Sequence, residues 1–351
     1  MDPRLDKFKS NGFNNMSAMK IVVVGLGPIG LASASAVDTE KDMQLVGLVD
    51  VDRTKQGQSL NQLTTTGGEN TSGIVVTDSI ADATGNEADV AIVATTSYFD
   101  AIVPTVMELL DRKIAVVSSC EQMIWPWYRH RDLADQVNSA AKCAGRTVLG
   151  SGVNPGFVMD TLAVMLSSMV LQVTGVHCVR RVDAATRRQP LQAKVGATMS
   201  AEQFKQLANQ EKIGHKGLAE SIALLAAGLG RRVEPESVHE TLDPILAEQP
   251  TQSALGLIEP GRVCGIHNVG QWAGDGLKIS LDLTMAVGTA DPHDRIELDG
   301  PVPLQLVVPG SVPGDSATVA ALLNTARIAH QAQPGMLTAL DVPLPGCQGR
   351  G

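Results

Sequence analysis

The sequence predicts an α/β fold with two parts, an N-terminal domain with a doubly wound parallel sheet and a C-terminal α+β domain with an open mixed sheet. The first observation is a series of short apolar runs that alternate with helix-length segments, as in βαβ units. The second is a glycine-rich turn between the first run and the first helical segment. The third is a change near Gly150, after which the apolar runs lengthen and alternate with polar residues.

The composition limits the possible functions. The chain has 351 residues, of which 44% are hydrophobic and 19% charged, which is typical of a folded protein long enough for two domains. A formal net charge of −9 argues against nucleic acid or an anionic membrane as the main partner. The five cysteines include no CxxC pair, so neither a disulfide framework nor a zinc site is predicted, and a cytoplasmic protein is expected. The seven histidines show no HExxH pattern, so no metal site is predicted from them either.

The elements of the N-terminal part follow in order. Residues 1–18 lack the apolar core of a secretory signal and predict a flexible leader. The β-branched run KIVVV at 20–24 predicts a buried parallel strand, and LASASAV after the glycine turn predicts a helix packed closely on the sheet. Further buried strands are predicted at residues 43–50, 88–96 and 113–119. GSGVNPGF at 150–157 predicts a hinge, which limits the first domain to residues 19–152.

The second part alternates in polarity. Long strands are predicted at residues 176–184, 277–287 and 294–308. Helices are predicted at 201–212 and 217–230, the latter nearly uncharged and therefore buried. A last helix is predicted at about 316–330, with Asp315 as its N-cap.

The glycine turn has the pattern of a dinucleotide-binding loop. Gly25, Gly27 and Gly30 form GxGxxG, with Pro28 and Ile29 inside it, directly after a predicted strand and before a predicted helix. The first glycine permits the turn, the second lets a pyrophosphate approach the backbone, and the third allows close helix packing. The alternative is a purely structural turn. The context on both sides favours a Rossmann domain that binds NAD or NADP.

The end of the second predicted strand bears on the choice between these cofactors. Asp50 favours NAD, because its carboxylate can accept hydrogen bonds from ribose hydroxyls and repels a 2′-phosphate. Arg53 and Lys55 follow where they could pair with that phosphate, although both could equally belong to a solvated loop. We therefore expect NADP or dual use rather than strict NAD.

Polar residues follow the predicted strands where ligands bind in open α/β sheets. The candidates for contact with the nicotinamide end of the cofactor are Thr95, Thr96, Ser119, Cys120 and Asn154. Glu121 is the only ionisable side chain in the segments after the third and fourth strands, and it stands beside apolar residues. It is the candidate general acid and base. The alternative is a first-turn carboxylate that accepts hydrogen bonds from backbone N–H groups.

Six motifs carry a resemblance to a known family over nearly the whole chain from about residue 19. They are, in order, GLGPIG, SSCEQMIWPW, GSGVNPGFVMDTL, RRVDAATRRQPLQAKVGA, GHKGLAES and PGMLTALDVP. Together they resemble the 2,4-diaminopentanoate dehydrogenases and the related native amine dehydrogenases, which are distant relatives of dihydrodipicolinate reductase. Dihydrodipicolinate reductase itself carries a histidine pair and a lysine followed by DAPSGT, whereas this chain has RRVDAATRR and KVGATMS. Its activity is therefore not expected here.

The resemblance implies NAD(P)-linked interconversion of a small amine with a carbonyl compound and ammonia. It implies that Glu121 is the catalytic glutamate, and that residues 153–312 cover the substrate and form a homodimer through their sheet. The C-terminal helix and tail, residues 313–351, are expected to return and complete the Rossmann domain. The alternatives are a reductase of a cyclic imine or unsaturated ring, and a non-catalytic NAD(P)-binding sensor. Intact motifs around Glu121 and Asn154 argue against the sensor.

The large apolar side chains that follow Glu121 in the sequence are expected to line the substrate pocket. Two of the three tryptophans, Trp125 and Trp127, lie there and could exclude water from an imine. The expected substrate contacts are Ile124, Trp125, Asn154, Phe157 and His215. Asn154 could instead shape the hinge, and His215 could be structural.

Other polar residues are weaker candidates. A substrate carboxylate could bind an arginine, although charged residues on an exposed strand and loop are usually solvated; the candidates are Arg180, Arg181, Arg187 and Arg188. Lys194 resembles a site lysine of the distant reductases. Asp160 is expected to cap or pair within its helix. We favour a small aliphatic or cyclic amine over a diamino acid.

Overall fold

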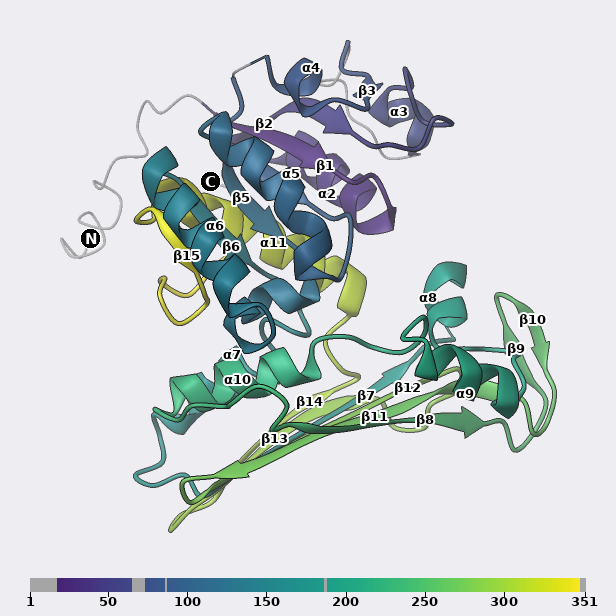
Figure 1. Cartoon of the computed structure of the whole chain (residues 1–351). Helices are drawn as coiled ribbons and strands as arrows, with labels where there is room; N and C mark the ends of the chain where they lie inside the picture. The colour runs from purple at the N-terminus through teal and green to yellow at the C-terminus, as the bar shows by residue number, and fades with distance from the viewer. Residues whose placement is uncertain (1–17, 65–72, 86, 186–187, 348–351) are drawn as a thin grey trace, which may run out of the picture.

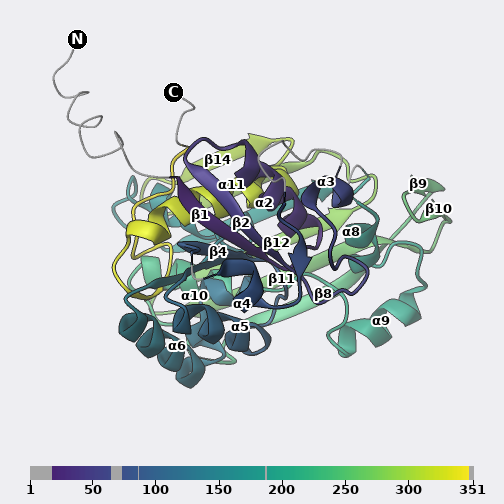
Figure 2. The same cartoon turned by 90° about the horizontal axis from the view of Figure 1, so that it is seen from above.

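The computed structural model describes residues 18–64, 73–85, 87–185 and 188–347. The predicted leader lies outside these residues except for residue 18. The described chain forms a helix-covered parallel sheet that stands over one side of a broad second sheet (Figure 1). Seen from above, α9 and the β9–β10 hairpin extend beyond the first sheet (Figure 2).

The first sheet is parallel throughout and has the strand order β15-β6-β5-β4-β1-β2-β3. Its central strands are buried on both faces, so their sequences are continuously apolar rather than alternating. This confirms the predicted Rossmann-type sheet. The strands are β1 (Met19–Val24), β2 (Met43–Val49), β3 (Val76–Thr77), β4 (Val90–Val93), β5 (Ala115–Ser118), β6 (Thr147–Gly150) and β15 (Gly335–Leu337).

Helices cover both faces of this sheet. Val22 and Val24 point to a core that includes Phe99 and Val137, whereas Ile21 and Val23 point to a core that includes Val37, Val319 and Leu322. The first core lies under α5 and α6, and the second under α2 and α11. The helices are α2 (Pro28–Thr39), α3 (Leu60–Leu63), α4 (Ile80–Thr84), α5 (Phe99–Asp111), α6 (Arg131–Ala144) and α11 (Gly314–Gln331).

The second sheet is mixed, in the order β14-β13-β7-β12-β11-β8. Only β7 and β12 pair in parallel, and the other neighbours are antiparallel. Its strands are β7 (Gly175–Asp183), β8 (His239–Leu246), β11 (Val263–Gly274), β12 (Leu277–Ala286), β13 (His293–Asp299) and β14 (Leu304–Pro309), and a separate hairpin joins β9 (Thr251–Ser253) to β10 (Gly256–Ile258). The helices are α7 (Thr161–Ser167), α8 (Gln189–Lys194), α9 (Ala201–Asn209) and α10 (Leu218–Gly228).

One face of the second sheet is apolar and the other is polar. Val176, Ile279 and Leu281 pack with the buried side chains of α10. The opposite face carries partly exposed side chains, including His177, His267, Asp282 and Arg295. In the described part of the chain the helices lie on the side that faces the first domain (Figure 1). This arrangement matches the predicted open sheet.

Two local expectations were wrong. Residues 294–308 do not form one strand but the antiparallel pair β13 and β14, because the intervening GPVP segment cannot continue the ladder. Asp315 is not the N-cap of the last helix. Pro313 holds that position, and Asp315 lies in the first turn, where Oδ2 is 2.9 Å from Nε of Arg188.

The C-terminal segment returns to the first domain. β15 adds a parallel strand beside β6, and α11 contacts α2, β4 and β5. These contacts support the proposed division in which residues 313–351 complete the domain of residues 19–152. Across the described residues, the structure contains no helix that is both long and apolar enough to cross a membrane.

Candidate active site

The glycine loop is shaped to receive a ligand at the start of α2. A Cβ atom at Gly30 would lie 1.8 Å from the carbonyl oxygen of Gly25, so only glycine allows this helix to pack on the loop. Gly25 has φ +87°, which also favours glycine. Gly27, by contrast, has open space where its side chain would be, and no side chain of the described residues caps the N-terminus of α2. The loop therefore leaves helix N–H groups accessible to a phosphate, as a dinucleotide requires.

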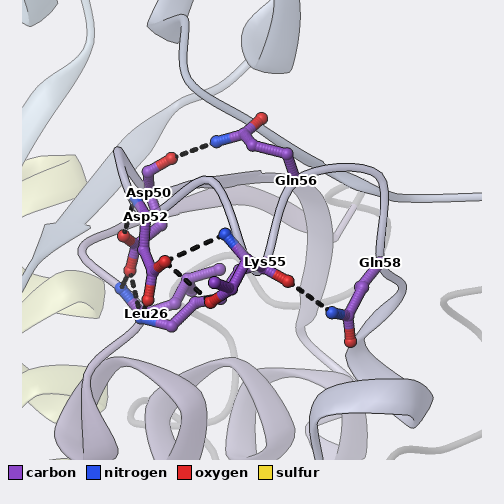
Figure 3. A network of polar contacts seen from close by, with 7 residues as sticks. Leu26, Asp50, Asp52, Lys55, Gln56 and Gln58 are labelled. Carbon is purple, nitrogen blue, oxygen red and sulfur yellow. Dashed lines mark hydrogen bonds and ion pairs between the residues drawn. The ribbon is translucent and has the colours of Figure 1, made fainter.

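Asp50 is held by a polar network at the end of β2 (Figure 3). Oδ2 accepts a hydrogen bond from the N–H of Leu26 at 2.7 Å and pairs with Nζ of Lys55 at 2.9 Å, while Oδ1 accepts from the N–H of Asp52. Burial raises the pKa of Asp50, but the hydrogen bonds from Lys55, Asp52 and Leu26 outweigh it and hold that pKa below its ordinary value. Arg53 is exposed, and Lys55 is the cation beside Asp50.

A cavity of about 310 Å³ extends from this loop to the second domain. Nine of the predicted site residues line it, which are Gly27, Pro28, Ile29, Thr95, Thr96, Ser119, Glu121, Asn154 and His215. The second domain adds apolar side chains and two cations, which are Val182, Leu191, Met285, Arg180 and Lys194, and α11 adds Gly314, Asp315 and Thr318. The strand ends, the hinge and the second domain thus converge on one space.

Hydrogen bonds at the end of β5 fix the position of Glu121. The hydroxyl of Ser118 donates to the carbonyl of Val93 and accepts from the N–H of Cys120, which turns the chain out of the sheet. Glu121 then begins a short 3-10 helix, η2 (Glu121–Ile124). The next side chain, Gln122, accepts a hydrogen bond from the N–H of Phe99 and ties η2 to the start of α5.

The carboxylate of Glu121 is available for chemistry. Its side chain is 19% exposed, and among the described residues no backbone N–H donates a hydrogen bond to it. Its partner is Lys194 at the end of α8, whose Nζ lies 3.6 Å from Oε1. This pair crosses from the first domain to the second. Lys194 was a weak candidate from sequence, and its resemblance to a site lysine of the distant reductases was the signal for it.

Asn154 and His215 form an uncharged pair in the same cavity. Nδ2 of Asn154 and Nε2 of His215 are 3.3 Å apart, and Oδ1 of Asn154 is buried without a hydrogen-bond partner. Burial, with the nearby positive charges of Lys194 and Arg180, lowers the pKa of His215 to about 3. His215 is therefore neutral at physiological pH. The N–H of Gly214 donates to the carbonyl of Lys194, which links this loop to α8.

Four of the expected nicotinamide and substrate contacts do not line this cavity. Cys120 is fully buried under the sheet, where burial and the neighbouring Glu121 raise the pKa of its thiol to about 12. Ile124 is 3% exposed. Phe157 packs against the core of the second domain. Trp125 faces another cavity, of about 280 Å³, where its ring centroid lies 5.8 Å from that of Trp127. The two indole rings therefore line a different cavity from Glu121.

The candidate arginines have other partners or positions. Arg180 is buried against Asp294, and Arg188 pairs with Asp315. Arg181 is exposed on β7, and Arg187 lies outside the described residues.

Asp160 caps α7, as expected from the sequence. It accepts hydrogen bonds from the N–H of Gly156 and the hydroxyl of Ser221, and thereby links the hinge to α10. Burial raises its pKa. Across the described residues, the His, Cys, Asp and Glu side chains form no group of three or more that could hold a metal.

Comparison with known proteins places this chain in a family. The chain is 26% identical to the 2,4-diaminopentanoate dehydrogenase of Acetoanaerobium sticklandii, over 94% of this chain and 95% of the relative. It is 23% identical to an amine dehydrogenase of Streptomyces virginiae, over 94% and 97%. The solved amine dehydrogenase from Mycobacterium smegmatis has the same fold, with a TM-score of 0.83, 21% identity and coverage of 95% and 98%. Residues 157–349 match the 2,4-diaminopentanoate dehydrogenase C-terminal domain, and the chain therefore belongs to that family.

Proposed function

We propose that the protein is an NAD(P)-dependent amine dehydrogenase, which oxidises a small amine to a carbonyl compound and ammonia and catalyses the reverse reductive amination. The observation that carries this proposal is the position of Glu121, in one cavity with the glycine loop and without a hydrogen bond from the backbone in the described residues. The names of both curated relatives agree with it.

The chemistry requires a base at this position. A bound nicotinamide supplies the hydride acceptor in one direction and the hydride donor in the other. The substrate arrives as an ammonium ion, and the nitrogen lone pair must be free before the C–H bond can break. Glu121 takes one proton from that nitrogen. Once that proton has passed to solvent, the Glu121 carboxylate can stabilise the iminium ion left by hydride transfer.

Glu121 also fits the remaining steps. Water adds to the iminium carbon, and the resulting carbinolamine loses ammonia to give the carbonyl compound. Proton transfer to and from Glu121 assists both steps and their reversal during reductive amination. His215, which is neutral, contributes hydrogen bonding rather than charge in this scheme.

The cofactor proposal is NADP or dual use. Lys55 is the cation that could pair with a 2′-phosphate, since its ammonium lies 2.9 Å from Asp50 and neutralises the carboxylate that would otherwise repel it. The helix N–H groups at Gly27 and Ile29 would hold the pyrophosphate. Thr95, Thr96 and Asn154 are the proposed neighbours of the nicotinamide.

We further propose a cytoplasmic homodimer. The polar face of the second sheet, with His177, His267 and Arg295, would meet the same face of a second copy. Among the described residues, Cys120, Cys143, Cys178 and Cys264 are free thiols, which fits a reducing compartment. Light scattering tests the dimer, and a monomer at micromolar concentration would contradict it.

The test is oxidation of NADPH and NADH with a panel of small ketones and aldehydes, with and without excess ammonium at alkaline pH. We expect oxidation that requires both carbonyl compound and ammonium. Oxidation without ammonium would indicate a carbonyl or ring reductase instead. Cofactor binding without any oxidation across the panel would favour the sensor.

A variant tests the role of Glu121. Glu121→Gln should reduce kcat by about 10² to 10⁴-fold, the usual contribution of a general base, while NADPH still binds with unchanged affinity. Glu202→Gln, on the exposed surface of α9, is the matched control. Equal kcat for Glu121→Gln and wild type would refute the assignment.

A further inference from the structure

A second cavity lies beside the two tryptophans that follow Glu121. Its volume is about 280 Å³, which is near the lower end of the range for small-molecule sites. None of the residues that line it also lines the cavity at Glu121. The proposed dehydrogenase reaction therefore gives no role to this space or to the two tryptophans of the WPW segment.

Aromatic rings form one part of the cavity wall. The ring centroids of Trp125 and Trp127 are 5.8 Å apart, with an angle of 63° between the ring planes. Nε1 of Trp127 donates a hydrogen bond to Asp135, whereas Nε1 of Trp125 has no hydrogen-bond partner in the described chain. Both indoles are half-buried, so part of each ring is open to a ligand. Such a surface suits a flat aromatic ring, which can stack on one indole or meet its edge.

Arginines form another part of the wall. Arg131, which is exposed in the first turn of α6, has no ion pair and no side-chain hydrogen bond among the described residues. Arg231 donates only to backbone carbonyls of the described chain, over 3.3 to 3.4 Å. Arg232 pairs with Glu234 at 2.9 Å. Two of the three arginines therefore carry positive charges that no described carboxylate neutralises.

These charges favour an anionic ligand. The whole chain has a formal net charge of −9, yet no acidic side chain of the described residues lines this cavity. An arginine guanidinium can donate two parallel hydrogen bonds to a phosphate. A phosphate monoester carries a charge of about −1.5 to −2 at neutral pH, which matches the two arginine charges better than a single carboxylate does.

Small side chains on α10 keep the cavity open. Ala223 and Ala227 both line it, and they lie four residues apart, so they share one face of the helix. Val233, which follows the helix, adds a buried apolar side chain to the same wall. A leucine at either alanine would occupy part of this volume.

We propose that this cavity is a second binding site, which takes an aromatic ring that carries a phosphate monoester. The ring packs against Trp125 and Trp127, and the phosphate pairs with Arg131 and Arg231. A nucleoside monophosphate and an aryl phosphate share this chemistry. The site is separate from the dinucleotide site at the glycine loop, so cofactor and ligand bind at the same time.

The test is calorimetric titration of AMP and of phenyl phosphate into the protein saturated with NADP, so that the glycine loop is already occupied. We expect one site per chain, and the tighter of the two ligands identifies the source as a nucleotide or an aryl phosphate. For that ligand, the ring alone (adenosine or phenol) and the phosphate alone (ribose 5-phosphate or inorganic phosphate) should each bind at least about tenfold more weakly. Absence of binding of both ligands at millimolar concentration would overturn the inference, and so would equal binding of either half.

A charge variant tests the arginines. Arg131→Gln with Arg231→Gln should raise the Kd by about tenfold to a hundredfold, the usual effect of removing charged hydrogen-bond donors. Lys205→Gln with Lys212→Gln removes the same amount of charge from exposed positions in and just after α9, and it should leave the Kd unchanged. An unchanged Kd in the double arginine variant, or an equal increase in the lysine control, would overturn the inference.

A cavity-filling variant tests the location without any change of charge. Ala227→Leu keeps all three arginines but should raise the Kd at least about tenfold, because the leucine occupies the space of the ring. A wild-type Kd in Ala227→Leu would overturn the inference, and a thermal unfolding transition confirms that the variant is folded. None of these measurements depends on turnover, so they decide the site whether or not the proposed dehydrogenase activity is found.

Discussion

Asp294→Ala should destabilise the second domain strongly. Asp294 is 2% exposed, and its carboxylate accepts two hydrogen bonds of 2.7 Å from Arg180 and one from the N–H of Val312. Removing one member of a buried pair leaves an uncompensated charge, which typically costs about 3–5 kcal/mol of unfolding free energy. Arg180 is equally buried, so water solvates its charge poorly when the Asp294 carboxylate is removed.

The assay is guanidinium unfolding followed by tryptophan fluorescence. Trp272 lies in the core of the affected domain and reports its unfolding. With a denaturant dependence of about 4 kcal/mol per molar, the loss corresponds to a midpoint lower by about 1 M. Asp243→Ala is the control, because Asp243 is exposed on β8 in the same domain and the change should stay within about 0.5 kcal/mol.

A double variant tests the cause of this loss of stability. Arg180→Met with Asp294→Ala removes both charges and should be more stable than Asp294→Ala alone. A loss below about 1 kcal/mol for Asp294→Ala, as for an exposed pair, would refute the claim that burial makes this pair costly to break. A double variant less stable than the single one would refute the claim that removing the carboxylate beside the Arg180 charge causes the loss.

Two other predictions concern cofactor and pH. Lys55→Met should weaken NADPH binding about tenfold more than NADH binding, measured by fluorescence titration, while Arg53→Met changes both less; equal losses for the two cofactors would contradict the role of Lys55. His215 has a pKa of about 3 when folded and about 6.5 when unfolded, so between these values the unfolded state binds more protons. Its contribution to stability is complete above pH 6.5 and falls as the pH drops towards 3. His215→Asn should therefore show a smaller decrease in Tm than wild type from pH 7.5 to pH 5 by calorimetry, and an equal decrease would contradict a depressed pKa.

Local patterns were sufficient to predict the fold class. The predicted strands at 20–24 and 113–119 could be recognised because β1 and β5 are buried on both faces and therefore almost continuously apolar. The strand at 43–50 could be recognised from its buried apolar end, although Gln44 in it is exposed. The strands β6 and β15 were missed because each is only a few residues long, and their pairing joins segments far apart in the chain. β8 was missed because most of its residues are exposed or half-buried, which gives no apolar pattern.

The sequence likewise predicted one part of the site and not another. Glu121 and the glycine loop could be predicted, because the carboxyl ends of parallel strands meet at one edge of the sheet. The directions of Trp125 and Lys194 could not, because the first depends on a turn after η2 and the second on packing between two domains. The spacing of residues in the sequence indicates the direction of neither side chain. The sequence therefore identifies Lys194 as part of a family motif but does not show that it pairs with Glu121.

The return of the chain through β15 has a consequence for synthesis on the ribosome. The first domain lacks an edge strand and the α11 side of its core until residues 314–337 have been made. Val319 and Leu322 cover apolar side chains of α2 and of the central strands, so a nascent chain that stops before them exposes that surface and the backbone edge of β6. A fragment of residues 19–152 should accordingly aggregate. In a chimera with another member of the family, the segment between the hinge and α11 should be replaced as one unit, so that α11 and β15 stay with the first domain that they complete.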